Sequence, residues 1–264
     1  MYATRYFKAQ SVDEACATLE TVDNATVLAG GMTLIPTLKQ RLAQTDMLID
    51  LAHTNLSFIE DTGTHLKIGA MSRHRDVETS ELVIKMIPAL ASLAGGIGDR
   101  QVRNCGTIGG SIANNDPSAC YPAALIGLEA TIHTSKRDIP ANTFFVGMFE
   151  TDLQETEIIT AVSFTKPEKA AYVKFPNPAS RYAMVGVFVA VTGQDVRVAI
   201  TGAGEDGVFR HEGMETALRT TFSANAVDDV TTDEDMLLSD IHAGSDYRAH
   251  LVREMTRRAV LACD

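Results

Sequence analysis

Residues 101–125 read QVRNCGTIGGSIANNDPSACYPAAL, and this stretch decides the fold that the sequence predicts. Three glycines, Gly106, Gly109 and Gly110, fall within five positions and are interleaved with hydroxyl, amide and carboxylate residues. Glycine lets the backbone approach a ligand closely, and N–H groups turned in one direction bind anions. The apolar residues behind them are expected to anchor the loop in a core. The stretch therefore predicts an anion-binding loop.

A second glycine pair follows an apolar segment near the start of the chain, where residues 28–36 read LAGGMTLIP. The pattern predicts a strand that runs into Gly30 and Gly31, then a helix over residues 34–42 that Thr33 caps. Free N–H groups at a helix start favour negative charge. Two such loops indicate one extended phosphate-bearing ligand that is held from both sides.

The composition excludes several classes of protein. The chain has 264 residues and is 45% hydrophobic, so it can bury the core of one large domain or of two to three small ones. A net charge of −11 argues against nucleic acid or an anionic membrane surface as a partner. Residues 228–240 contribute much of this charge and are expected to form a solvated surface.

No segment reaches the ~18 apolar residues of a membrane span, and the start of the chain lacks a signal-peptide pattern. We expect a cytoplasmic protein. The four cysteines and seven histidines share no metal-ligand spacing, so we expect no metal site and interpret every histidine as a surface or structural residue. No nucleophile motif is present either. Any chemistry would then depend on an organic cofactor, and we assign no catalytic residue.

The remaining pattern alternates strands and helices. We expect a strand at residues 4–10, a helix that starts with a capping box at Ser11 and Glu14, and a β-hairpin around residues 62–64. Ser72 or Thr79 is expected to begin the next helices. Residues 96–100, GIGDR, are interpreted as a glycine-rich helix end rather than a ligand loop.

A change of pattern at residues 166–169, KPEK, is the candidate domain boundary, because charge and proline interrupt the apolar periodicity there. An apolar run at residues 183–191, AMVGVFVAV, predicts a core element. The last helix places Leu251, Met255, Ala259 and Val260 on one face. The C-terminal part is therefore expected to be a small α+β domain.

The two glycine loops together resemble the two flavin loops in the FAD-binding subunits of molybdenum hydroxylases. This family includes xanthine dehydrogenase and aerobic carbon monoxide dehydrogenase, whose medium subunit has a similar length. The loops occur in the same order, about 75 residues apart. The opening FKAQSVDEA and the final DYRAHLVREMTRRAV resemble the corresponding ends of that subunit, so the resemblance covers the whole chain.

The resemblance implies an α+β fold of the vanillyl-alcohol-oxidase/p-cresol-methylhydroxylase type. Residues 1–167 would form an FAD-binding domain, with subdomains at about 1–54 and 55–167 that hold FAD between them. Residues 168–264 would form a C-terminal flavoprotein domain.

The resemblance also implies which residues bind FAD. Two runs would contact the pyrophosphate and ribose, mainly through backbone N–H groups, and the remaining positions would lie at the loop rim, the adenine or flavin edge, and the isoalloxazine ring. In that order, the predicted residues are Ala29, Gly30, Gly31, Met32 and Thr33; Thr107, Ile108, Gly109, Gly110 and Ser111; Asn114 and Asp116; Ile158 and Ile159; and Lys174 and Tyr182.

Two positions depart from the family pattern. Cys120 stands where an acidic residue that can bind the ribose is common, and Met32 stands where a polar residue is common. Both glycine loops are intact, so the prediction of FAD binding stands.

The function implied is that of an electron-transfer subunit in a dimer of heterotrimers. A large partner subunit would carry a molybdenum cofactor, and a small partner would carry [2Fe-2S] clusters that pass electrons to FAD in this chain. Two alternatives stay open. One is a self-sufficient flavin oxidase or reductase, for which Lys174, Arg181 and Tyr182 are the candidate proton-handling residues. The other is a non-catalytic nucleotide-binding assembly protein. The sequence leaves the substrate and the electron acceptor undetermined.

Overall fold

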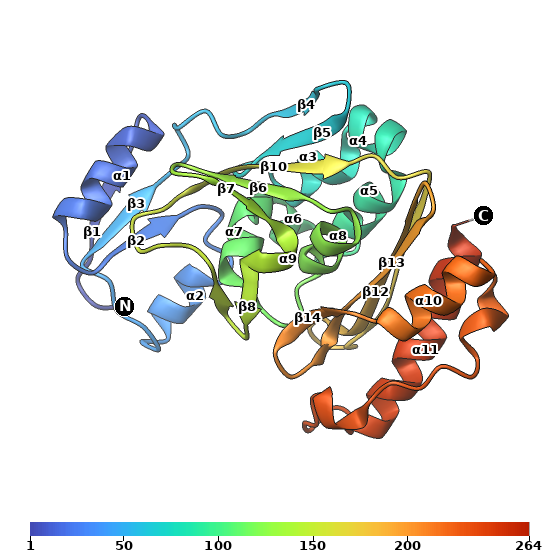
Figure 1. The fold of residues 1–264 in the computed structure, drawn as a ribbon. Helices are drawn as coiled ribbons and strands as arrows, with labels where there is room; N and C mark the ends of the chain where they lie inside the picture. The colour runs from blue at the N-terminus through green and yellow to red at the C-terminus, as the bar shows by residue number, and fades with distance from the viewer. Residues whose placement is uncertain (264) are drawn as a thin grey trace.

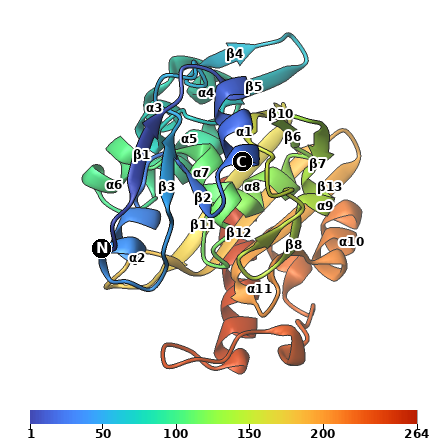
Figure 2. The same ribbon diagram turned by 90° about the vertical axis from the view of Figure 1, so that its left-hand side faces the viewer.

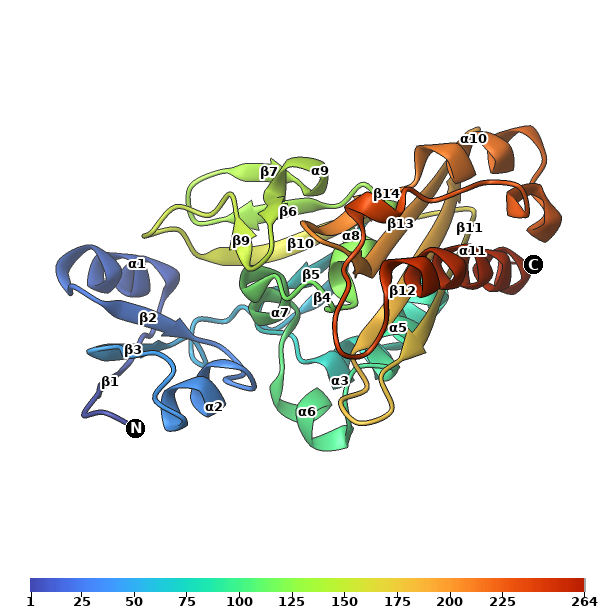
Figure 3. The same ribbon diagram turned by 90° about the horizontal axis from the view of Figure 1, so that it is seen from below.

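The computed structural model describes residues 1–263, which form three parts in chain order (Figure 1). The N-terminal part is a parallel sheet in the order β1-β3-β2, with its two helices on opposite sides (Figures 1 and 3). In Figure 2 this part faces the viewer, in front of the others. Its elements are β1 (Arg5–Lys8), α1 (Val12–Thr21), β2 (Ala25–Leu28), α2 (Leu34–Lys39) and β3 (Met47–Asp50).

The start of α1 confirms the predicted capping box. The N–H of Glu14 donates to the Ser11 hydroxyl at 3.1 Å, and the Glu14 carboxylate accepts from the N–H of Gln10 at 2.6 Å. These bonds satisfy N–H groups that a helix start leaves free. The helix predicted at residues 34–42 is shorter than expected: it ends at Lys39, and Thr33 precedes it without a side-chain cap.

The central part contains an antiparallel sheet in the order β4-β5-β10-β6-β7, packed against a layer of short helices. The hairpin of β4 and β5 confirms the turn predicted around residues 62–64. The strands are β4 (Ile59–Asp61), β5 (His65–Gly69), β6 (Thr131–Thr134), β7 (Asp138–Pro140), β8 (Phe145–Gly147), β9 (Glu150–Thr151) and β10 (Ile159–Thr165). The helices are α3 (His74–Thr79), α4 (Glu81–Met86), α5 (Pro88–Gly95), α6 (Arg100–Cys105), α7 (Ile108–Asn114), α8 (Tyr121–Gly127) and α9 (Ala141–Phe144).

The prediction that Ser72 or Thr79 begins a helix is wrong, because the N-caps of α3 and α4 are the residues that follow them, Arg73 and Ser80. Ser72 donates its hydroxyl to the carbonyl of Phe58 at 3.0 Å, which ties it to the loop before β4. Thr79 donates to the carbonyl of Arg75 within α3. The cap of α4 is Ser80, whose hydroxyl accepts from the N–H of Val83.

The C-terminal part is an antiparallel sheet in the order β11-β12-β13-β14, with helices on its outer face. The predicted core run at residues 183–191 lies in β12 and is buried on both faces. Val185 and Val187 pack against the outer helices, whereas Phe188 packs into the core of the central part. The elements are β11 (Lys169–Pro176), β12 (Ala183–Thr192), β13 (Asp195–Gly204), β14 (Gly207–Arg210), α10 (Glu212–Thr220), η1 (Ala224–Val227), η2 (Glu234–Met236) and α11 (Ser245–Ala262).

The structure confirms the predicted α+β class. The apolar face predicted for the last helix is also confirmed, since Leu251, Met255, Ala259 and Val260 are all buried. The chain passes from β10 to β11 at the proposed boundary around residues 166–169, and the domain limits stay a prediction. Among the helices of residues 1–263, none has the length and apolar character needed to cross a lipid bilayer.

A buried arginine ties α11 to the sheet beneath it. The Arg248 side chain is 3% exposed and donates to the carbonyls of Met184 and Gly202, each at 2.7 Å. It also donates to the carboxylate of Asp240 at 2.8 Å. A single guanidinium thereby connects a helix, two strands and the loop before the helix.

We expect the Arg248→Ala variant to lose about 3 kcal/mol of unfolding free energy, because two buried carbonyls lose a charged donor. The matched control is Arg258→Ala on the same helix, whose ion pair with Glu254 is exposed and should contribute less than about 0.5 kcal/mol. Urea unfolding measures both values. Equal losses in the two variants would contradict the role of Arg248.

Candidate functional site

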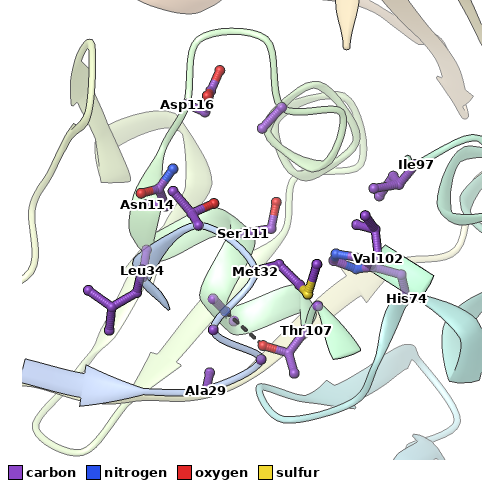
Figure 4. Close-up of a pocket in the computed structure, with 18 of the residues that line it drawn as sticks. Ala29, Met32, Leu34, His74, Ile97, Val102, Thr107, Ser111, Asn114 and Asp116 are labelled. Atoms are coloured by element: carbon purple, nitrogen blue, oxygen red, sulfur yellow. Dashed lines mark hydrogen bonds between the residues drawn. The ribbon is translucent and has the colours of Figure 1, made fainter. Parts of the chain in front are cut away.

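A cavity of about 600 Å³ lies where segments from all three parts of the chain come together. Its walls include the loop after β2, the first turn of α7 and the end of the β11–β12 loop. Figure 4 shows side chains from both glycine loops around the same space. Small-molecule pockets have volumes of about 300–1,000 Å³. The cavity is therefore large enough for an extended organic ligand.

All but one of the residues singled out from the sequence line this cavity. The exception is Ile108, whose side chain is fully buried in the central core and whose N–H donates to the carbonyl of Ser72 at 3.0 Å. The predicted residues that line the cavity are Ala29, Gly30, Gly31, Met32, Thr33, Thr107, Gly109, Gly110, Ser111, Asn114, Asp116, Ile158, Ile159, Lys174 and Tyr182. Their roles toward a cofactor stay a prediction.

The first loop presents unpaired main-chain donors. Within residues 1–263, the N–H groups of Gly30, Gly31, Met32 and Thr33 donate no hydrogen bond. Gly31 has a φ of +67°, a left-handed conformation that favours glycine. Consecutive N–H groups around a left-handed residue form a concave anion-binding surface. This loop can therefore receive a negatively charged group through its backbone.

The second loop uses its N–H groups for internal bonds. Gly109 donates to the carbonyl of Ala70 at 2.9 Å, and Gly110 donates to the Thr107 hydroxyl at 3.1 Å, the dashed line in Figure 4. Ser111 donates to the carbonyl of Thr107. The expectation that this loop acts mainly through N–H groups is therefore not met over residues 108–111. The N–H of Thr107 and the hydroxyl of Ser111 have no partner within the described residues.

The two loops touch backbone to backbone. A Cβ atom placed on Gly30 would lie 2.1 Å from the carbonyl oxygen of Cys105 and 2.7 Å from the Cα of Gly106. One placed on Gly110 would lie 3.5 Å from the Cβ of Ala29. Only glycine at position 30 allows this approach, so the contact fixes the distance between the two walls.

At another side of the cavity, Lys174 holds the β11–β12 loop against the central helices. Its Nζ donates to the carbonyl of Gly96 at 2.6 Å and to that of Arg181 at 2.9 Å, and it lies 3.6 Å from the Cys120 sulfur. These three contacts match the three donors of an ammonium group. The residue next to Arg181 is Tyr182, which lines the cavity and is 46% exposed. Lys174 therefore positions the loop that carries this ring.

Asp116 and Tyr182 both line the cavity and both have raised pKa values. Burial raises the pKa of Tyr182, and the charges of Asp116 and Cys120 raise it further. Burial also raises the pKa of Asp116, whereas a hydrogen bond from the N–H of Ser118, at 2.8 Å, acts to lower it. The phenol therefore stays neutral at ordinary pH.

A buried carboxylate fixes the wall next to Ile158 and Ile159. Burial alone would raise the pKa of Glu157, but hydrogen bonds from Arg137, Thr134 and the N–H of Gln154 hold it below its usual range. These neighbouring groups thus compensate the negative charge of Glu157 within the cavity wall. We interpret Glu157 as an anchor for the two isoleucines, which are 3% and 5% exposed.

Several lining residues were not anticipated from the sequence. Residues 96–100 were interpreted as a helix end, which is correct for Gly96 because its N–H caps α5. However, Ile97 and Gly98 also line the cavity. His74, interpreted as surface or structural, lines it as well and is only 5% exposed. Their spacing along the chain gives no signal of this role, because these residues line the cavity only once distant segments have folded around it.

Comparison with known proteins agrees with this geometry. Residues 2–167 match a family model described as the FAD binding domain in molybdopterin dehydrogenase. The chain is similar to the nicotine 6-hydroxylase medium subunit of Paenarthrobacter nicotinovorans, with 31% identity over 98% of this chain and 96% of that one. It is also similar to the glyceraldehyde dehydrogenase medium chain of Sulfolobus acidocaldarius, with 32% identity over 96% of each chain.

The structure is similar to a chain in the solved carbon monoxide dehydrogenase from Hydrogenophaga pseudoflava that lacks the Mo-pyranopterin moiety of the molybdenum cofactor. The TM-score is 0.88 at 30% identity, and the match covers 99% of this chain and 97% of that chain. This likeness confirms the fold that the resemblance implied.

We expect Gly30→Ala to destabilise the protein by about 2 kcal/mol, because a methyl group at this position overlaps the backbone of Cys105 and Gly106. The control is Gly147→Ala, where the nearest atom to an added Cβ is a flexible carboxylate oxygen of Glu150 at 3.5 Å. Its effect should stay within about 0.5 kcal/mol. Thermal and urea unfolding measure both. If the two variants are equally stable, the loops do not depend on this contact.

We expect the stability of the ligand-free protein to fall as the pH drops from 6.5 toward 4. Burial lowers the pKa of His74 to about 4, and the charge of Arg103 adds to the effect, whereas the ordinary value is 6.5. Between these values the unfolded chain binds a proton that the folded chain does not, so stability present above pH 6.5 is lost. The difference corresponds to roughly 3 kcal/mol.

Urea unfolding of the wild type and of His74→Gln across this pH range isolates the contribution of His74 to the unfolding free energy. The wild type should lose more unfolding free energy than the variant as the pH falls. Parallel pH profiles would show that His74 is not buried as a neutral ring.

Proposed function

Because the chain belongs to the family of FAD-binding domains of molybdopterin dehydrogenases, we propose that it is the FAD-carrying, electron-transferring subunit of a molybdenum hydroxylase complex. The observation that carries this proposal is the pair of loops at one cavity. The first loop offers four unpaired N–H groups, and the second closes against it at the distance set by Gly30. A cofactor with a central diphosphate fits this arrangement, since its charged centre would lie between the loops.

The residues present fit the ends of such a cofactor as well. Ile158 and Ile159 offer apolar surface at one wall, and the Tyr182 ring offers an aromatic face at another. Most ligand pockets combine apolar walls with a few well-placed polar groups. We propose that the nucleotide end lies near the isoleucines and the isoalloxazine ring near Tyr182.

The chain's own residues would bind and orient the cofactor. FAD, when bound, supplies the capacity to accept and release electrons, and a protein tunes such a group through position and electrostatics. Lys174 fixes the β11–β12 loop and, with it, the place of Tyr182. Asp116 adds a carboxyl group whose pKa burial raises. These residues define the surroundings of the electron carrier.

The names of the related proteins support the proposal of partner subunits. The relatives are a medium subunit and a medium chain of complexes. We propose that a large subunit carries the molybdenum cofactor and that a small subunit carries [2Fe-2S] clusters, arranged as a dimer of heterotrimers. Substrate would be oxidised on the large partner, and electrons would reach FAD in this chain before they leave to an external acceptor. A cytoplasmic location stays a prediction.

The alternative of a self-sufficient flavin oxidase needs a residue that is free to move a proton. Lys174, one of its candidates, already donates to two carbonyls and contacts a sulfur. Arg181, another candidate, donates to the carbonyl of Gly98 at 3.4 Å, and Tyr182, the third, has a phenol whose pKa is raised by burial. The structure therefore offers this alternative no specific support, and electron transfer is the function that we propose.

We expect the purified full chain, freed of flavin, to bind one equivalent of FAD with a dissociation constant at or below about 1 μM. Quenching of flavin fluorescence during titration measures it. Gly31→Ala should weaken binding at least about tenfold, because it alters the left-handed turn that orients the free N–H groups.

The matched control is Gly193→Ala in the turn between β12 and β13. Gly193 also has a left-handed φ, +59°, but it lies outside the cavity. It should retain wild-type affinity. A wild-type chain that takes up no FAD would overturn the proposed function, whereas equal affinities of the two variants would overturn only the role of the first loop.

A further inference from the structure

His74 is a buried polar side chain that has no hydrogen-bond partner. It is 5% exposed, and within residues 1–263 neither nitrogen of its ring makes a hydrogen bond. Buried polar groups are paired in the great majority of cases, and leaving one unpaired costs about 1–3 kcal/mol. For His74 the enclosed unpaired atom is Nδ1, whereas Nε2, which also has no partner among the described residues, is available to a ligand at the cavity wall.

The position of the ring points to the cavity. His74 lines it, and its Nε2 atom lies 2.6 Å from a Cβ placed on Gly106, which lines the cavity too. Figure 4 shows nitrogen of the His74 ring on the side that faces Met32. Of the two ring nitrogens, Nδ1 is enclosed by protein. Nε2 is therefore the atom that a ligand can reach.

The surrounding structure holds this ring in place. The N–H of His74 donates to the carbonyl of Gly106 at 2.9 Å, which fixes the start of α3 to the second loop. The ring also packs against Tyr121 of α8, with ring centroids 5.4 Å apart. A donor fixed in this way loses little conformational freedom when a ligand binds, so most of its hydrogen bond contributes to affinity.

The ring has one proton to share at neutral pH. Burial and the charge of Arg103 keep the pKa of His74 well below its ordinary value, so the ring is neutral. A neutral imidazole carries its proton on one nitrogen. An unpaired N–H at the enclosed Nδ1 would be costly, which favours the proton on Nε2.

We propose that His74 is a further cofactor-binding residue, which donates a hydrogen bond from its Nε2–H to an oxygen in the phosphate or ribityl portion of FAD. This inference rests on the proposed function. It adds to the binding surface a side chain that belongs to neither glycine loop. Its location beside Met32 also supplies a polar contact next to the first loop, at a position where the loop itself carries a thioether.

The first experiment compares FAD affinity in the flavin-free full chain and its variants. His74→Leu removes the donor at similar volume and should raise the dissociation constant about tenfold. His74→Gln restores a donor at a similar position and should recover most of the affinity. His250→Leu, at an exposed histidine of α11, should bind FAD as the wild type does. Thermal unfolding of each flavin-free protein shows whether it is folded.

The second experiment reads the hydrogen bond in the wild type. In protein labelled with ¹⁵N-histidine, the Nε2 resonance of His74 should shift when FAD is added, and the Nδ1 resonance should keep the position of an unprotonated nitrogen. This measurement decides the question even if the leucine variant does not fold.

Wild-type affinity in a folded His74→Leu variant, or a His74 resonance that does not respond to FAD, would overturn this inference while leaving the proposed function intact. A wild-type chain that does not bind FAD would overturn both. The two failures are therefore distinguishable.

Discussion

The close approach of Gly30 to the backbone of Cys105 and Gly106 is the contact on which the rest of the site depends. The N-terminal sheet stands at one side of the molecule, as Figure 3 shows, and it reaches the second loop through this contact. A side chain at position 30 would force the loops apart and widen the space between the walls. The spacing of the two loops at this junction thus depends on the missing Cβ atom of Gly30. Packing of apolar residues, such as Ile158 in the N-terminal core, stabilises the same junction but does not set the spacing.

The C-terminal sheet completes the cavity because it is buried on both faces. Phe188 places one face against the central helices, and the valines of β12 place the other against α11. With the sheet fixed in this way, its β11–β12 loop can reach across to the end of α5, where Lys174 ties it down. The site is therefore shared between distant segments, and its geometry is as rigid as the core that carries them.

The sequence predicted the α+β class, the capping box at Ser11 and the cavity-lining positions of both glycine loops, because these depend on local chemistry. It did not predict which loop keeps its donors free. Gly109 donates to Ala70, a residue nearly forty positions away, and such a pairing has no local signature. Ser72 does not cap α3, because the helix begins one residue later than expected, with Arg73 as its N-cap. His74 was missed because burial, not spacing, makes it a cavity residue.

The two loops thus have different physical roles although their sequences look alike. In the second loop, the N–H groups of residues 108–111 bond to the chain itself, so its glycines serve close packing against Ala70. In the first loop, four N–H groups have no partner within the described residues, while Gly30 allows the close contact with Cys105 and Gly106 and Gly31 adopts a left-handed φ. Binding through main-chain donors depends on backbone shape and not on side-chain identity. The side chains of Met32 and Cys120 therefore leave the free N–H groups of the first loop in place. The residues that set this backbone shape are Gly30, through its close contact with the second loop, and Gly31, through its left-handed φ.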